Sequence, residues 1–171
     1  MNHLEQLVAE WLQYRGYFVR MSVQVGPLPH GGFEGELGVV GFYPKGEHLL
    51  HVECSLDAES WAEKDRRFRT KFERGRKFAH KLFPGLSVPK TLDQVAVIQI
   101  SGTDRREVGG HRLITVRDLV HEIFAGLEGK SPLKGAVPSN LPLLRTLQVA
   151  ADAVKGTATE RRLIPTATIP G

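Results

Sequence analysis

Apolar and polar residues alternate along the chain with two periods, one typical of helices and one typical of strands. Near the N-terminus, Leu4, Val8 and Trp11 recur at helical spacing, which predicts a helix over residues 2–14 that ends before Gly16. Runs with a period of two residues follow, separated by turns rich in Gly and Pro. The predicted strands cover residues 17–25, 36–43, 48–55, 92–100 and 112–115.

A second helical stripe predicts the longest helix of the chain. Trp61, Phe68, Phe72 and Ala79 fall on one face of a helix over residues 58–82, which a Pro-Gly pair ends. Two shorter helices are predicted over residues 116–127 and 141–154.

The resulting order is α-β-β-β-α-β, followed by a short strand and two helices. This order is typical of an α/β (α+β) fold, in which helices cover the faces of a mixed sheet. We expect a single domain over residues 1–154. Residues 155–171 have no periodicity, so they are expected to form a flexible tail or an arm that packs on a partner.

Two of the strands are expected to form an antiparallel hairpin, since only a short turn around Lys45 and Gly46 separates them. In the second of these strands, side chains alternate between the two faces. Leu50, Val52 and Cys54 share the apolar face, which makes Cys54 a core residue, and the other face carries His51, Glu53 and Ser55.

Positive charge is concentrated in the longest predicted helix. The chain has 23 Lys and Arg against 19 Asp and Glu, a net charge of +4. Between residues 64 and 81, nine basic residues face only two acids, which favours a polyanion such as DNA as partner; the alternative is a solvated helix face. The candidate nucleic-acid-binding residues are Arg66, Arg67, Arg69, Arg74 and Lys77.

The cellular setting is constrained by what the sequence lacks. It contains no run of about 18 apolar residues and no secretory signal pattern, so no membrane association is expected. Cys54 is the only cysteine, which excludes an internal disulfide and favours a cytoplasmic location.

The candidate chemistry comes from acids on neighbouring strands with lysines nearby. Metal-dependent nucleases use such acids to hold divalent ions, and a lysine beside the attacked phosphate. The helix with a glutamate (LEQLVAEWL), the ELGVV strand and the HVECS strand together resemble the PD-(D/E)xK superfamily over roughly residues 1–100. That superfamily includes type II restriction enzymes, Mrr-like proteins and archaeal Holliday junction resolvases, so the resemblance implies a restriction-endonuclease-like core.

The resemblance implies a set of acidic ligands in which one is missing. Glu5 matches the helix glutamate that often joins the metal site, and Glu53 matches the acid of the (D/E)xK element. Gly38 stands where the family has aspartate, and Glu36, two residues earlier, is expected to substitute for it. The alternative for Glu5, Glu36 and Glu53 is that they are ordinary surface acids.

The lysine of the signature is missing too, because Ser55 occupies its position. Lys64 and Lys71 lie seven residues apart on one face of the long helix, from which a lysine could reach toward Glu53. Both could equally be solvated.

Three functional hypotheses follow. The first is a divergent nuclease dependent on Mg²⁺ or Mn²⁺ that hydrolyses phosphodiester bonds in DNA, with Glu36, Glu53 and either Lys64 or Lys71 as catalytic residues and Glu5 as a further metal ligand. The second is an inactive nuclease-fold module that binds nucleic acid or a protein. The third is a subunit of a larger defence or repair assembly, with residues 155–171 as its docking arm. A homodimer is compatible with the first two.

Overall fold

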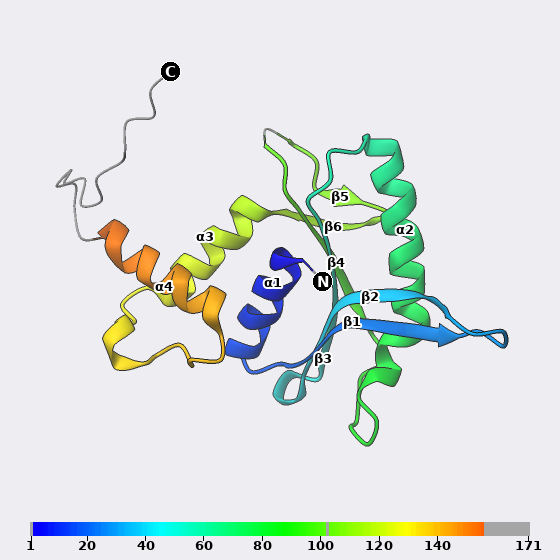
Figure 1. The fold of residues 1–171 in the computed structure, drawn as a ribbon, viewed down its shortest axis with the longest axis horizontal. Helices are drawn as coiled ribbons and strands as arrows, with labels where there is room; N and C mark the ends of the chain where they lie inside the picture. The colour runs from blue at the N-terminus through cyan, green and yellow to red at the C-terminus, as the bar shows by residue number, and fades with distance from the viewer. Residues whose placement is uncertain (1, 102, 156–171) are drawn as a thin grey trace, which may run out of the picture.

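The chain folds as a mixed α/β structure built on a six-stranded sheet (Figure 1). The computed structural model describes residues 2–101 and 103–155, so the predicted tail lies outside the described residues apart from Lys155. The strand order is β1-β2-β3-β4-β6-β5; β3, β4 and β6 are parallel, and the remaining neighbours are antiparallel. The strands are β1 (Phe18–Pro27), β2 (Phe33–Tyr43), β3 (His48–Ser55), β4 (Asp93–Ile98), β5 (Glu107–Val108) and β6 (His111–Thr115).

Helices cover both faces of the sheet. The helices are α1 (His3–Tyr14), α2 (Trp61–Phe78), α3 (Val116–Leu127) and α4 (Pro142–Lys155). One face packs against α1 and α3 through a core that includes Leu4, Trp11 and Ile123, and α4 packs on these two helices. The other face packs against α2 through Phe68 and Phe72. Burial of these apolar side chains is the main stabilising contribution.

The sequence signals that start the helices act as expected from their chemistry. Three helices begin with a capping box, formed by Asn2, Ser60 and Thr115 with the acid three residues later. In each box the side chain of the cap residue accepts from the backbone amide of the acid, and the carboxylate of the acid accepts from the backbone amide of the cap residue. Glu10 of α1 accepts a hydrogen bond from the backbone nitrogen of Leu144 at 2.8 Å, which ties the start of α4 to α1.

The β3 prediction is confirmed in its bounds and in its alternation. Val52 and Cys54 lie in the core beneath α1, whereas His51 and Glu53 face α2. The bounds of one helix differ from the prediction, and one strand was not predicted. The helix predicted over 58–82 begins at Trp61, because Ser60 caps it, and becomes a 3-10 helix from Ala79. The two-residue strand β5 was missed, because two residues are too few for a periodic pattern.

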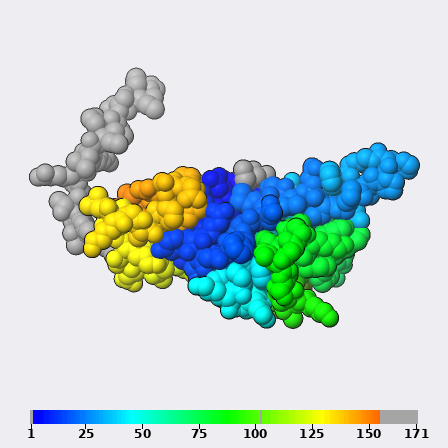
Figure 2. Space-filling model, turned by 90° about the horizontal axis from the view of Figure 1, so that it is seen from below, coloured from blue at the N-terminus to red at the C-terminus, as the bar shows by residue number. Residues whose placement is uncertain are grey.

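Strands β1 and β2 extend beyond their predicted bounds, and the hairpin that they form projects from the body as an arm (Figure 2). Part of the loop predicted over 26–33 is in fact strand, and the turn is confined to a few residues after Pro27. Gly31 and Gly32 both have positive φ values there, of 91° and 81°, which glycine adopts without steric cost. No helix in the described part of the chain is long and apolar enough to cross a membrane.

Candidate functional site

Glu53 is the centre of a buried polar cluster between the sheet and α2. Its side chain is fully buried, yet both carboxylate oxygens accept hydrogen bonds. Oε1 accepts from the backbone nitrogen of Gly38 at 3.0 Å and lies 2.9 Å from His51 Nε2. Oε2 accepts from Lys71 Nζ at 2.7 Å. A buried charge requires this compensation, because desolvation would otherwise disfavour ionisation.

The backbone amide of Gly38 is available to Glu53 because strands β2 and β3 separate at this point. The ladder between β2 and β3 ends at the pair Val39 and Val52, so the Gly38 nitrogen bonds to a side chain instead of to β3. On β1, the neighbouring strand on the other side of β2, Ser22 lies opposite Gly38. Ser22 is likewise outside the β1–β2 ladder, and its φ is positive, at 47°. A non-glycine residue in this region stores strain, and such residues are frequent at functional sites.

Glu5 brings a second carboxylate to the point beside Gly38 where β2 and β3 separate, which we call the fork. It lies in the first turn of α1, is buried, and its Oε2 accepts from the backbone nitrogen of Asn2 at 3.1 Å. A Cβ atom placed on Gly38 would lie 3.2 Å from Glu53 Oε2 and 3.5 Å from Glu5 Oε1. The two carboxylates therefore flank the position at which the PD-(D/E)xK signature has aspartate.

The hydrogen-bonding role of each ring nitrogen of His51 is set by residues from two other elements. Gln94 Nε2 donates to the Phe72 carbonyl at 2.8 Å and lies 3.0 Å from His51 Nδ1. An amide nitrogen only donates, so Nδ1 must accept and the proton of the neutral ring resides on Nε2, which then donates to Glu53. This chain of bonds orients the carboxylate.

The acidity of Glu53 reflects competing effects. Burial is the largest and raises its pKa, but the interactions of the carboxylate with His51 and then with Lys71 together outweigh it, so the net pKa lies well below the ordinary glutamate value. Glu53 is thus ionised at neutral pH. A carboxylate held in the ionised form is available as a ligand for a cation.

Glu53 is therefore expected to make the fold sensitive to acid. A depressed pKa in the folded state adds stability that is present above the unfolded-state value and lost as pH falls below it. The loss should be on the order of 2 kcal/mol between about pH 5 and pH 2, and Glu53→Gln should remove it. Urea unfolding of both proteins across this pH range measures the difference. Equal pH dependence in both would contradict the account, and Glu36→Gln, at an exposed acid of β2, is the matched control.

Lys71 is the lysine that reaches Glu53, and the prediction for Lys64 is wrong. Lys64 is buried near the start of α2, where its Nζ donates to the carbonyls of Asp57 and Glu59 at 2.8 and 2.6 Å. The shared helix face was correct, but α2 runs along the sheet, so residues seven apart reach different places. Lys64 stabilises the loop before α2 instead.

Ser55, at the lysine position of the signature, contacts a cation from α2. Arg67 donates to Ser55 Oγ at 2.7 Å and to Asp57 Oδ2 at 2.6 Å. The same guanidinium bonds Glu59 Oε1 at 3.0 Å, so Arg67 has protein partners besides any phosphate. β3 lacks the lysine of the signature, and α2 instead supplies two cationic side chains, Arg67 beside Ser55 and Lys71 beside Glu53.

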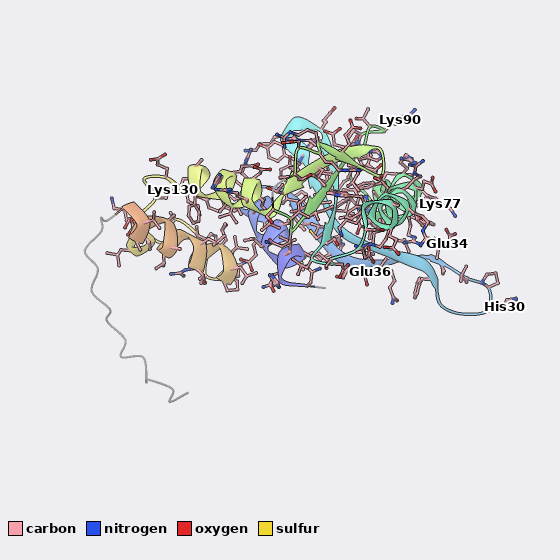
Figure 3. All side chains as sticks on the ribbon, turned by 90° about the horizontal axis from the view of Figure 1, so that it is seen from above. His30, Glu34, Glu36, Lys77, Lys90 and Lys130 are labelled. Atoms are coloured by element: carbon pink, nitrogen blue, oxygen red, sulfur yellow. The ribbon has the colours of Figure 1, made fainter. Side chains whose placement is uncertain are left out.

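Glu36 does not join the cluster, contrary to its predicted role as a substitute ligand. It is exposed on the hairpin arm that ends near His30 (Figure 3), and its side chain makes no hydrogen bond or ion pair among the described residues. The carboxylates beside Gly38 are those of Glu5 and Glu53 instead. Two residues along an extended strand span about 7 Å, which is enough to leave the site.

The exposed side of α2 forms a mostly basic groove beside the cluster, with a volume of about 420 Å³. Its lining residues are Glu59, Glu63, Arg66, Arg67, Thr70, Lys71 and Arg74. Lys71 belongs to both the groove and the buried cluster, so it links solvent to Glu53. Of the other predicted nucleic-acid-binding residues, Lys77 pairs with Glu34 at 2.6 Å (Figure 3), and Arg69 is exposed outside the groove.

The acids available for a metal ion are limited to a pair. Across residues 2–101 and 103–155, no group of three or more His, Cys, Asp or Glu side chains could hold a metal ion. Glu5 and Glu53 nevertheless converge, and Mg²⁺ is often bound by one or two carboxylates with water completing its shell. The donor set therefore fits a hard divalent cation held by two carboxylates.

Comparisons with known proteins do not assign this site. No family model matches the chain, and no curated protein matches it. Among solved structures, the chain is similar to the crystal structure of AF1548, a protein of unknown function, at 12% sequence identity and a TM-score of 0.40. That match covers 90% of this chain and 97% of the other. A likeness at this level carries no argument about function, which therefore has to be argued from the cluster around Glu53.

Proposed function

We propose that this protein is a divergent DNA nuclease with a restriction-endonuclease-like core, and that Glu5, Glu53 and Lys71 form its active site. The observation that supports this most directly is the 2.7 Å contact between Lys71 Nζ and Glu53 Oε2, beside the Glu5 carboxylate. Two acids and one lysine at a strand fork are the groups that phosphodiester hydrolysis requires. Lys71 supplies the cation that the HVECS strand lacks.

Each residue has a distinct role in this proposal. Glu5 and Glu53 would hold Mg²⁺ or Mn²⁺, which supplies a nucleophilic water of lowered pKa and offsets charge on the phosphate. His51, through its hydrogen bond from Nε2, keeps the Glu53 carboxylate oriented and ionised. Lys71 lies at the wall of the groove, from which its ammonium can orient a phosphate oxygen.

DNA would enter along the groove on α2. Arg66 and Arg74 line it, and neither guanidinium group makes a hydrogen bond or ion pair within the described residues. Guanidinium groups of this kind bind phosphate oxygens and release counterions, so affinity should fall steeply as salt is raised. The proposed path therefore brings the backbone of the nucleic acid directly past Lys71.

A second candidate is a nucleic-acid-binding module whose catalysis has been lost. It is favoured by Gly38, which offers no third carboxylate, and by the protein partners that already occupy both oxygens of Glu53. In this case the groove would still bind backbone phosphate, while the Lys71–Glu53 pair would serve only to stabilise the fold.

The deciding experiment incubates the full chain with supercoiled plasmid, branched DNA and single-stranded DNA, with Mg²⁺ or Mn²⁺ and with a chelator, beside a binding assay over a salt series. The proposal expects cleavage that requires the metal and binding that weakens with salt. Salt-dependent binding without cleavage under either metal would favour the second candidate. The absence of both binding and cleavage would rule out both.

A further inference from the structure

A second hollow lies on the opposite face of the sheet, between α1 and α3. Its volume is about 350 Å³. The floor is aliphatic and comes from three parallel strands, and Trp11 of α1 and Leu119 of α3 form walls. The floor residues are Leu50, Val52, Val95, Val97 and Ile114. Leu50, Val95 and Ile114 are only half-buried, so apolar surface here remains open to solvent.

The acids at the rim of this pocket are already paired. Asp93 Oδ2 lies 2.8 Å from His48 Nε2, and the other ring nitrogen of His48 lies 2.7 Å from the Tyr17 hydroxyl. Glu122 accepts a hydrogen bond from the Trp11 indole nitrogen at 3.0 Å and lies 3.6 Å from Arg15. Both rim carboxylates therefore already have polar partners within the protein.

Arg112 is the exception among the charged groups of the rim. It lies on β6 between Val95 of β4 and Glu107 of β5 and is exposed, and its guanidinium makes no hydrogen bond, ion pair or ring contact in the described part of the chain. The pocket thus combines an aliphatic floor with one guanidinium group that makes no hydrogen bond or ion pair in the described part of the chain. This combination is complementary to a molecule with an apolar body and a single anionic group.

We propose that this pocket binds an aromatic carboxylate or a similar amphipathic anion, whose ring system lies on the aliphatic floor and whose anionic group pairs with Arg112. The size supports this class, because a cavity of about 150 Å³ holds benzene, so about 350 Å³ accommodates a fused two-ring body. Burial of the ring system would supply the affinity, and the guanidinium would supply the selectivity for an anion.

The pocket is distinct from the cluster around Glu53, and its ligand does not depend on the proposed nuclease activity. Glu5 lies in the first turn of α1, whereas the pocket is lined by the later part of that helix, from Val8 to Arg15. Glu53 and Lys71 lie on the face that packs against α2. Nothing in the proposal requires DNA or a metal ion.

The test is an NMR titration of the full chain, labelled at the methyl groups of Ile, Leu and Val, with 2-naphthoate and with uncharged 2-naphthalenemethanol. The proposal expects saturable shifts at Leu50, Val95 and Ile114, with tighter binding of the acid. Arg112→Gln should weaken naphthoate binding roughly five- to tenfold and leave the alcohol unchanged. Arg69→Gln, the same change of charge on α2, should alter neither.

Three results would overturn the proposal. The first is shifts that do not saturate or that centre on methyl groups away from the pocket. The second is equal affinity for the acid and the alcohol, which would remove the role of the positive charge. The third is equal naphthoate affinity in Arg112→Gln and the unsubstituted protein. Since Arg112 is exposed, the substitution should leave the fold intact, which the methyl spectrum itself reports.

Discussion

Glu53→Gln is expected to lower DNA cleavage on the order of 10³-fold, the loss typical of a group that acts directly in catalysis. Glutamine has the same shape, so its side-chain oxygen can still accept from the Gly38 amide and from His51. Its amide group would face the Lys71 ammonium, which repels it, and the negative charge needed for a cation would be gone. Cleavage should fall, while DNA binding through the groove should change little.

Glu36→Gln is the informative comparison, because it removes the same charge from a neighbouring strand. Glu36 is exposed on the hairpin arm and should leave cleavage within about twofold, as surface substitutions usually have small effects. Initial rates on plasmid, with folding checked by circular dichroism, measure both. If Glu36→Gln also abolished cleavage, the active site would be the pair Glu36 and Glu53, and Glu5 would lose its assigned role.

Local pattern was sufficient to predict the strand that carries Glu53. The alternation along residues 48–55 placed Glu53 opposite the apolar face of Val52 and Cys54, and the pairing and burial of β3 confirm it. Helical spacing likewise placed Lys71 near the edge of the buried stripe of α2. These predictions worked because side-chain direction within one element follows from the backbone period alone.

Contacts between distant elements were beyond the same reasoning. Gln94 fixes the tautomer of His51 from 43 residues away, and only the parallel pairing of β3 with β4 makes them neighbours. The separation of β2 from β3 at Gly38 was also not predictable, because it depends on the pairing partner rather than on local sequence. For the same reason the sequence did not distinguish Lys64 from Lys71, since their reach depends on how α2 lies across the sheet.

Gly38→Asp is expected to raise the affinity for Mn²⁺ on the order of 10²-fold, which corresponds to about 2.7 kcal/mol. The new carboxylate would extend from a Cβ that lies 3.2 Å from Glu53 Oε2 and 3.5 Å from Glu5 Oε1. Three acids would then share one site with a single lysine. Without metal their repulsion should destabilise the fold, and with metal the third ligand should more than restore it.

Gly38→Asn separates this charge effect from the steric effect of adding any side chain. A Cβ at this position lies 3.0 Å from the Val52 carbonyl oxygen, so both variants should lose some stability in chelator. The aspartate variant should gain more melting temperature than the asparagine variant as Mn²⁺ is added, and only it should show the tighter binding by calorimetry. If the aspartate variant bound Mn²⁺ no more tightly than the asparagine variant, position 38 would not face a metal site. A gain in the aspartate variant would mean that one missing carboxylate separates this fork from a complete metal site.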